Sequence, residues 1–550
     1  MTVVLAGTIL PASRADANPF APLGSRARWL SFLLPLFLLS IRLGAAPLFD
    51  VDEGAFSEAT REMFERGDFL STFLNGAPRY DKPILIYWLQ AASVLVFGQN
   101  EFAFRFPSAL AAALWCHAVA VFAAPRFGQR AALFGCGIAA TSLGVFVIGR
   151  AATADALLNM LIALTLFDAW RHIERMSSGT AAGSRAPLYR AWLWIALGVL
   201  TKGPVAVLVP ATTVFLYALV GGPFRLRDAL RMFFNLRGWA ILVVVAAPWY
   251  AAALAIHGRD FIDGFLLRHN VERFTGTLQG HSGSAFYYVL MVPLLLVPWL
   301  AWLGAAIGAG WRDVRAGSMA PLHRFLWIWC LFVIVFFSLS GTKLPHYALY
   351  GCTPLFVLMA AARERIAHAW FAAIPVLLLF AFIIVLPNGF VHAAEAGWIR
   401  DAYYRATALR AEVGLPDFYR PVAWAALLLG LVMLARQWRL GTNVAAPADR
   451  VLAASVVATI TLCTIAAPYV GEVLQGPVKR AALVARSMPE PAVTWNFHMP
   501  SFAVYRQRVT PIGTPQPGEL ALTRIDRLPK DAAVDIVFQE GGVALVKRRR

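Results

Sequence analysis

The chain has 550 residues, of which 59% are hydrophobic and 15% are charged, and its net charge is +18. Its mean hydropathy of +0.62 lies outside the usual range of soluble domains and is typical of a polytopic membrane protein. The basic residues stand in short clusters between apolar runs, as cytoplasmic loops do under the positive-inside rule, so the charge does not indicate a nucleic-acid partner. The five cysteines lie inside apolar runs without CxxC spacing, which argues against a disulfide framework or a zinc site.

Apolar runs long enough to cross a bilayer begin at about thirteen places. They start near Trp29, Phe106, Arg130, Ala154, Tyr189, Gly203, Gly238, Ala285, Arg324, Pro345, Ala369, Arg420 and Arg450. The first run is longer than the apolar region of a signal peptide, and we expect it to remain as an uncleaved span. The sequence therefore predicts an all-α polytopic membrane protein with about thirteen transmembrane helices, preceded by a cytoplasmic tail over residues 1–28.

One further apolar run, residues 83–98, is too short to be counted with the others. As a helix it reaches only about 24 Å, against a hydrocarbon core of about 30 Å. If it does not span, the arginine-rich loops all face the cytoplasm, as the positive-inside rule requires; if it spans, the later loops invert. We therefore expect an interfacial helix at 83–98 inside a first outer loop of residues 49–105.

The loops predicted on the outer face carry most of the unusual polar residues. The segment 49–105 is too long for an idle connection, and it opens with the acidic stretch "FDVDEGAFSEATREM". The outer set contains the carboxylates Asp50, Asp52, Glu53, Glu58, Asp81 and Asp155, the cations Arg79, Lys82, Arg150, Lys202, Arg268, Arg273 and Lys343, and the histidines His257, His269, His281 and His346. Such mixed charge at a membrane face suits an anionic substrate, and Lys82, just before the interfacial helix, is placed to neutralise a phosphate tethered to a lipid tail.

Composition changes again after the last span. Residues 468–550 contain a helical stretch, a strand-like "AVTWNF" and a final segment that predicts a hairpin turning at Gly541-Gly542. We expect a membrane domain over residues 29–467 and a small α/β domain over 468–550, which an odd number of spans places outside the cell.

Several motifs resemble a known family. The stretch from "FDVDEGAF" to "FRFPSAL", together with "GRAATADALLNM", "LTKGPVAVLVP", "HNVERF" and "FSLSGTKLPHYALY", closely resembles bacterial membrane glycosyltransferases of the GT-C superfamily. These are related to protein O-mannosyltransferases and include the aminoarabinose lipid A transferases. The resemblance covers roughly residues 29–361 and implies a GT-C architecture in a bacterial inner membrane, with the active site and the C-terminus in the periplasm.

The resemblance also implies the donor and several site residues. The donor would be a sugar on a polyprenyl phosphate such as undecaprenyl phosphate. Carried over by motif, Asp52 and Asp155 are the catalytic carboxylates, and Lys82, Lys202, Arg273 and Tyr347 bind substrate. The outer-loop residues Glu53, Asp81, Arg150 and Lys343 complete the predicted substrate-binding set.

Two points about the substrate stay open at this stage. Aminoarabinose transferases usually follow the first Asp-Glu with Thr-Arg-Tyr, whereas this chain has Gly54-Ala55-Phe56. The acceptor is therefore left as lipid A or another periplasmic glycan, lipid or protein. No cofactor is implied; the four outer histidines lack ligand spacing, and a divalent metal ion is only an alternative.

Each candidate side chain also has a structural interpretation. Asp52 and Asp155 would cap helices, Lys82 and Arg273 would snorkel to the interface, Lys202, Arg150 and Lys343 would anchor span ends, and Tyr347 would belong to an aromatic belt.

Transfer from a polyprenyl phosphate by a single displacement predicts inversion at the anomeric carbon. Lys82 and Arg273 would stabilise the departing phosphate, and Asp52 would accept the proton of a hydroxyl acceptor. With a phosphate acceptor, which is already ionised, Asp52 would orient the substrates instead. No dinucleotide fingerprint or P-loop is present, in keeping with a donor that is not a nucleotide.

The alternative is a transporter or flippase of lipid-linked sugars. It predicts ionisable residues in the middle of spans, and the sequence places few there, Arg42 being the main exception.

Overall fold

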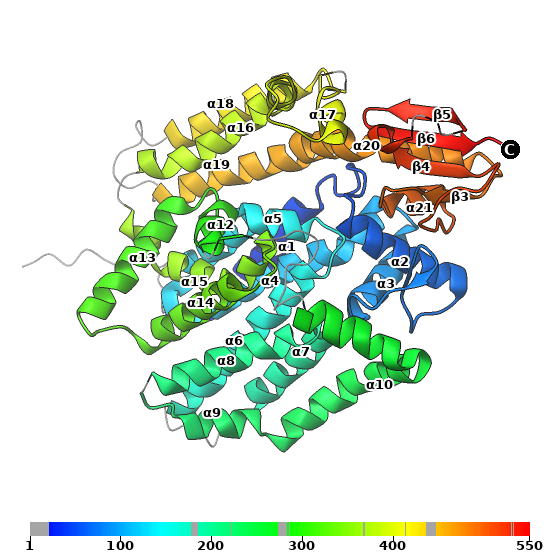
Figure 1. Ribbon diagram of the computed structural model, residues 1–550. Helices are drawn as coiled ribbons and strands as arrows, with labels where there is room; N and C mark the ends of the chain where they lie inside the picture. The colour runs from blue at the N-terminus through cyan, green and yellow to red at the C-terminus, as the bar shows by residue number, and fades with distance from the viewer. Residues whose placement is uncertain are drawn as a thin grey trace, which may run out of the picture.

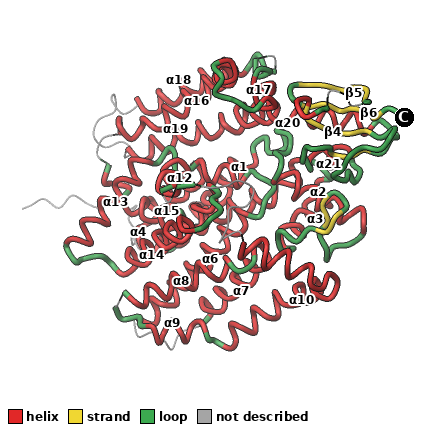
Figure 2. The backbone as a smooth tube through the Cα atoms, viewed as in Figure 1, coloured by secondary structure: helices red, strands yellow, loops and turns green. Residues whose placement is uncertain are grey.

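The structure is a computed structural model, and it describes residues 21–177, 185–220, 222–272, 283–284, 286–366, 369–412, 414–435, 447–529, 531 and 533–550. Helices form most of it, and strands occur in two places, a short hairpin near α2 and α3 and a sheet at the C-terminus (Figures 1 and 2). The predicted fold class, a helical membrane protein with a small C-terminal sheet domain, is confirmed.

The first half of the chain forms the centre of the bundle and its lower layer as drawn in Figure 1. Its elements are α1 (Ser25–Ser40), α2 (Asp52–Arg66), β1 (Phe73–Leu74), β2 (Ala77–Pro78), α3 (Leu85–Phe97), α4 (Glu101–Thr141), α5 (Leu143–Gly149), α6 (Asp155–Ser177), α7 (Ala186–Lys202), α8 (Val205–Leu219), α9 (Leu226–Phe233), α10 (Leu236–Phe261) and the π-helix η1 (Ile262–Glu272). The predicted interfacial helix corresponds to α3.

The second half adds further helices and the C-terminal sheet. Its elements are α12 (Tyr287–Leu295), α13 (Leu300–Arg315), α14 (Pro321–Leu339), the 3₁₀-helix η2 (Pro345–Gly351), α15 (Thr353–Ala361), η3 (Arg363–Arg365), α16 (Ala369–Glu395), α17 (Ala402–Ala408), α18 (Tyr419–Ala435), α19 (Pro447–Thr461), the π-helix η4 (Leu462–Ala466), α20 (Ala467–Arg486), β3 (Ala492–Thr494), α21 (Ser501–Arg506), β4 (Leu520–Arg524), η5 (Ile525–Arg527), β5 (Val534–Glu540) and β6 (Val543–Arg548). Helices α16, α18 and α19 run side by side along one edge of the bundle (Figure 1).

Six helical stretches of the described chain are long and apolar enough to cross a membrane. They are Glu101–Thr141, Asp155–Ser177, Leu226–Arg268, Pro321–Leu339, Trp370–Glu395 and Pro447–Arg486. The count of about thirteen spans stays a prediction. Two of the predicted runs, near Phe106 and Arg130, lie in α4, which comprises two helices joined at Gly128, where φ is 82°.

Large apolar side chains are exposed along the outside of the bundle. They include Trp29, Leu33 and Phe37 on α1, Val243, Val244 and Leu254 on α10, Leu378, Phe382 and Val385 on α16, and Trp424, Leu428 and Val432 on α18. Contiguous apolar surface of this kind is unfavourable in water and stable against hydrocarbon. The protein is therefore a polytopic membrane protein whose helices expose a lipid-facing belt.

The C-terminal domain is built on the end of a long helix. Residues 447–486 are helical throughout, and at 1.5 Å per residue they reach about 60 Å, twice the hydrocarbon thickness. The far end packs Val478, Ala481 and Ala485 beneath Leu520 and Leu545 of the sheet. This helix runs across the domain boundary expected at residue 468, and that boundary stays a prediction.

The C-terminal sheet has the strand order β3-β4-β6-β5. Strand β3 pairs with β4 in parallel, and β4–β6 and β5–β6 pair antiparallel. The hairpin predicted at Gly541-Gly542 is confirmed, because β5 ends at Glu540 and β6 begins at Val543. Figure 1 shows this domain at the same end of the bundle as α2 and α3.

The segment between α1 and α2 is held by a buried arginine of α4. Arg105 donates from Nε and Nη2 to the two carboxylate oxygens of Glu53, at 2.8 and 2.7 Å, and from Nη1 to the carbonyls of Leu43 and Ala46, at 2.9 and 2.6 Å. The backbone N–H of Ala152 also donates to Glu53, at 2.7 Å. These bonds join the start of α2 to α4 and to the α5–α6 connection.

Replacing Arg105 with alanine is expected to destabilise the protein by about 3–5 kcal/mol, because it leaves the Glu53 carboxylate buried without its partner. The side chains of this pair are 3% and 5% exposed. The matched control is Arg549→Ala. The side chains of Arg549 and its partner Asp535 are each 62% exposed, and we expect this substitution to cost about 1 kcal/mol or less. Unfolding of both variants in detergent micelles is the measurement, and equal losses would contradict the structural role of Arg105.

Candidate active site

One cavity with charged walls has a volume of about 460 Å³. Its polar lining consists of Asp50, Asp52, Glu53, Arg105, Arg150, Thr153, Asp155 and His346, and its apolar lining includes Phe146, Val147, Phe382, Leu386, Leu462 and Val470. The cavity thus combines charged groups from the start of α2, α4 and the α5–α6 connection with an apolar wall from α5, α16, η4 and α20. A cavity divided in this way suits a molecule with a charged head and an apolar tail.

Asp52 is the first residue of α2 and is exposed at this cavity. The N-cap residue is Val51, and no side chain caps the helix. Asp52 therefore does not cap α2, which was the structural alternative to an active-site role. Its carboxylate lies in the first turn, where the helix dipole favours negative charge. Asp52 is therefore an exposed carboxylate at the cavity wall.

Asp155 and Lys202, far apart in the sequence, form an ion pair at the cavity. Lys202 Nζ donates to Asp155 Oδ1 at 2.5 Å and to Tyr350 Oη at 3.0 Å, and Tyr350 Oη lies 3.3 Å from the same carboxylate oxygen. His346 Nε2 lies 3.6 Å from it. The two charged side chains are only 12% and 10% exposed, so Asp155 is a fixed, paired carboxylate.

The turn that presents Lys202 depends on a glycine. Gly203 separates α7 from α8 with φ of 75°, and a Cβ there would lie 2.7 Å from the ring of Phe265. The positive φ and the close ring both favour glycine. The tight hairpin indicated by "TKGP" is confirmed.

Two tyrosines of η2 complete the surroundings of Lys202. The rings of Tyr347 and Tyr350 stack at 6.0 Å, and Lys202 Nζ lies 5.5 and 5.7 Å from their centres. On a 3₁₀-helix, residues i and i+3 eclipse one another. Tyr350 is therefore a site residue that the family motifs did not select, and the Tyr-x-x-Tyr spacing is the feature of the sequence that could have predicted it.

A second charged group lies just before α3. Asp81 accepts from Arg79 Nη2 and from Lys82 Nζ, each at 2.8 Å. Burial alone would lower the pKa of Arg79, but the adjacent Tyr87 and Asp81 raise it, with a further contribution from Asp52. The predicted residues Asp81 and Lys82 thus form one charged pair before α3, and Asp155 and Lys202 form another at the cavity.

The other predicted residues are placed differently. Glu53 lines the cavity but is committed to Arg105, and Arg150 donates to the carbonyls of Leu39 and Ile41, each at 2.8 Å. Lys343 is buried and donates to the carbonyl of Ser340 at 2.7 Å. These contacts hold the backbone in place.

Some predicted positions lie where side chains are not described, namely Arg273, His269 and His281. His257 contacts Ser71 Oγ at 2.9 Å and Tyr80 Oη at 3.3 Å. Among the described residues, no group of three or more His, Cys, Asp or Glu side chains is arranged to hold a metal ion.

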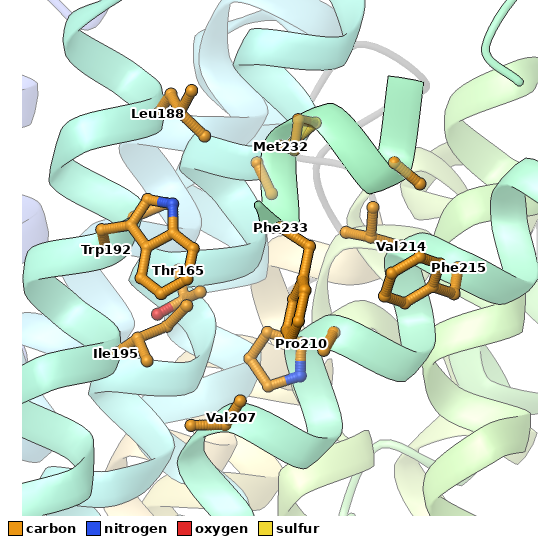
Figure 3. A pocket seen from close by; sticks show the side chains of 14 residues that line it. Thr165, Leu188, Trp192, Ile195, Val207, Pro210, Val214, Phe215, Met232 and Phe233 are labelled. Carbon is orange, nitrogen blue, oxygen red and sulfur yellow. The ribbon is translucent and has the colours of Figure 1, made fainter. Parts of the chain in front are cut away.

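A second cavity lies between α6, α7, α8 and α9 and is almost wholly apolar. Figure 3 shows Trp192, Ile195, Pro210 and Phe233 around it, with Thr165 as the polar side chain. Its volume is about 60 Å³. Its lining contains no charged group, in contrast to the cavity at Asp52.

Asp50 is the least expected member of the charged cavity. Its Oδ1 accepts from the backbone N–H of Ser501 at 2.9 Å, and its Oδ2 accepts from the Ser501 hydroxyl. Removal from water raises the pKa of Asp50 from 3.8 to about 7; the bonds from Ser501 partly offset this rise, and the charge of Glu53 adds to it.

Comparisons with known proteins agree with this picture. A family model described as dolichyl-phosphate-mannose-protein mannosyltransferase matches residues 81–251. An undecaprenyl phosphate-alpha-4-amino-4-deoxy-L-arabinose arabinosyl transferase of Serratia proteamaculans is 30% identical over 345 residues, which is 62% of this chain and 60% of that protein. The enzyme of the same name from Aeromonas salmonicida is 29% identical over 429 residues, 74% of this chain and 76% of that protein.

Solved structures extend the likeness to nearly the whole chain. The crystal structure of ArnT from Cupriavidus metallidurans bound to undecaprenyl phosphate superposes with a TM-score of 0.73 at 20% identity, covering 94% of this chain and 97% of that one. Its apo form gives 0.74, also at 20% identity, covering 95% and 98%. The chain thus has the fold of a GT-C membrane glycosyltransferase. Its resemblance to the protein O-mannosyltransferase-like and aminoarabinose transferase group is confirmed.

Stability is expected to depend on pH through Asp50. Between about pH 4 and pH 7 the folded protein keeps a proton on Asp50 that the unfolded chain has lost, so the free energy of unfolding falls as pH rises across this window. The side chain introduced by Asp50→Asn does not titrate. The melting temperature of this variant minus that of the wild type should therefore increase from pH 5 to pH 7.5 and stay constant above pH 7.5. A difference that stays constant with pH would contradict this assignment.

Proposed function

We propose that this protein is an inverting glycosyltransferase that moves a sugar from a polyprenyl phosphate, such as undecaprenyl phosphate, to an acceptor at the outer face of the bacterial plasma membrane. The observation that carries the proposal is the cavity in which the exposed Asp52 and the paired Asp155 face an apolar wall. A lipid-linked sugar has the same division into a charged, reactive head and an apolar tail.

The apolar wall gives the donor a route from the bilayer. Val147 and Phe382 line the cavity, yet they are 53% and 56% exposed, so the wall reaches the lipid-facing surface. An isoprenoid tail entering there would stay in contact with hydrocarbon or apolar side chains throughout. The relative from Cupriavidus metallidurans was crystallised with undecaprenyl phosphate, and we carry this donor over to the present chain.

The cations near α3 suit the phosphate of the donor. Lys82 and Arg79 share Asp81, and their side chains, each 11% exposed, lie in a partly dehydrated region where charge is worth more than in water. As the bond between the anomeric carbon and the phosphate oxygen breaks, the phosphate takes the bonding electrons. Fixed positive charge beside it lowers the barrier to this step.

The acceptor attacks the anomeric carbon from the opposite side, and a single displacement inverts its configuration. An acceptor hydroxyl must lose its proton, and Asp52, exposed in the cavity, is the base we assign to it. An acceptor phosphate carries no such proton, so Asp52 then orients it. Asp155 is already paired with Lys202, and we assign it to positioning of the sugar.

Lipid A is the acceptor class that we place first, with other envelope glycans and proteins behind it. The curated relatives carry the name of an aminoarabinosyl transferase. Gly54 departs from the usual motif of such enzymes at the start of α2. The identity of the sugar and of the acceptor must therefore be determined by experiment.

The central test uses Asp52→Asn with a polyprenyl-phosphate sugar and two acceptors. With a hydroxyl acceptor we expect kcat to fall by about 10²- to 10⁴-fold, because the base is lost. With a phosphate acceptor we expect a smaller loss. Released polyprenyl phosphate and glycosylated acceptor are quantified together by mass spectrometry.

Asp535→Asn, which alters an exposed carboxylate on the C-terminal sheet, is the matched control and should retain wild-type kcat. Equal losses for both acceptors would contradict the base assignment. Movement of the lipid across vesicles without release of polyprenyl phosphate would instead favour a flippase.

The proposal also fixes the side of the membrane on which the cavity opens, with the C-terminal domain in the periplasm. All five native cysteines are buried. The cysteine introduced by Asp52→Cys would therefore be the exposed thiol that a maleimide can reach. We expect a membrane-impermeant maleimide to label it in intact spheroplasts as fast as in lysed ones. Labelling only after lysis would place the cavity in the cytoplasm and overturn the proposal.

A further inference from the structure

The C-terminal domain reaches the start of α2 through one serine. Ser501 is the first residue of α21 and is fully buried. Its backbone N–H and its hydroxyl both donate to the carboxylate of Asp50, 451 positions earlier in the chain. Asp50 stands two residues before Asp52, so this contact bears directly on the segment that carries the exposed carboxylate.

Gly54 gives this contact the space it needs. A Cβ at position 54 would lie 2.0 Å from Asp50 Oδ1 and 2.5 Å from the backbone nitrogen of Ser501. Both distances are far below van der Waals contact, so any side chain there would push α21 away from the start of α2. The glycine that separates this chain from the usual aminoarabinose transferase motif is thus the residue that admits Ser501.

A second contact of α21 lies on the other side of Asp50. The backbone N–H of Leu48 donates to Tyr505 Oη at 2.7 Å, and Tyr505 Oη in turn donates to Glu101 at 3.1 Å. Lys479 of α20 pairs with the same Glu101 at 2.5 Å. The C-terminal domain therefore contacts residues 48–54 before and after position 52. Arg105 holds the same segment through Glu53.

We infer that Asp50 and Ser501 are positioning residues through which the C-terminal domain sets the place of Asp52 in the cavity. This inference rests on the proposed function, in which Asp52 is the reacting carboxylate. Asp52 has no cap bond of its own that fixes it, so its position follows from the backbone on either side. Neither Asp50 nor Ser501 needs to touch substrate for this role.

The kinetic test compares variants that break the contact with one that keeps it. Ser501→Ala and Asp50→Ala are expected to lower kcat by about 10- to 100-fold, because a displacement of about 1 Å in a reacting group costs this much. The KM for the lipid-linked sugar should stay within about twofold. Asp50→Asn should restore most of kcat, since its amide can accept from the Ser501 N–H and donate to its hydroxyl.

Ser487→Ala is the matched control, because its hydroxyl bonds only within its own helix, to the carbonyl of Val484 at 2.8 Å. It should leave kcat and KM unchanged. Melting temperatures of all variants are recorded, and kcat is measured at a temperature at which each variant is folded.

A readout without catalysis separates this inference from the proposed function. In the Asp52→Cys background, adding Ser501→Ala should change the rate of maleimide labelling at position 52 several-fold, and adding Ser487→Ala should not. If the wild type transfers no sugar but labelling responds to Ser501, the proposed function fails and the positioning contact stands. If the wild type is active and neither kcat nor labelling responds to Ser501→Ala and Asp50→Ala, the inference is overturned.

Discussion

The arrangement of the whole cavity depends on one buried ion pair. Arg105 holds both oxygens of Glu53 and, at the same time, carbonyls of the segment between α1 and α2. Charges buried to this degree are stable only when nearly all of their hydrogen-bonding capacity is used, and Glu53 accepts a further bond from Ala152. The pair thereby joins three separate segments, and each of them contributes a charged group to the cavity. A loop of this length would otherwise leave Asp52 without a defined position relative to Asp155.

The division of the cavity into a charged and an apolar wall follows from where each wall originates. The charged groups come from connections and helix starts, namely the segment before α2 and the α5–α6 connection, where backbone and side chains can be solvated. The apolar wall comes from α5, from α16 and from the helix that continues into α20, and the last two are apolar because they face hydrocarbon. A site at the end of a membrane helix bundle therefore combines the two environments, and a lipid-linked substrate is the kind of molecule that needs both.

Much of this arrangement could be predicted from the sequence because it depends on local pattern. The short helix α3, the "TKGP" turn at Gly203 and the final hairpin are set by run length and glycine, and each is present where it was expected. The motifs select Asp155 and Lys202 as separate site residues, but their ion pair is seen only in the structure. What the sequence could not supply are contacts between distant segments. Nothing local distinguishes Glu53, which is buried and committed to Arg105, from Asp52, which is exposed, and the partner of Asp50 lies 451 positions away.

The departure at Gly54 acquires a physical meaning once the contact of Asp50 is known. From the sequence alone, Gly54-Ala55-Phe56 is a loss of the polar motif of related enzymes and bears only on substrate choice. In the structure, a Cβ on the same glycine would lie 2.5 Å from the backbone nitrogen of Ser501, the first residue of α21. A side chain at this position and the Ser501 bond to Asp50 exclude one another on steric grounds. A relative with a larger residue at the equivalent place must therefore support its reacting carboxylate by a different contact. In our proposal, the C-terminal domain is thus a structural part of the active site, although it contributes none of the side chains that would react.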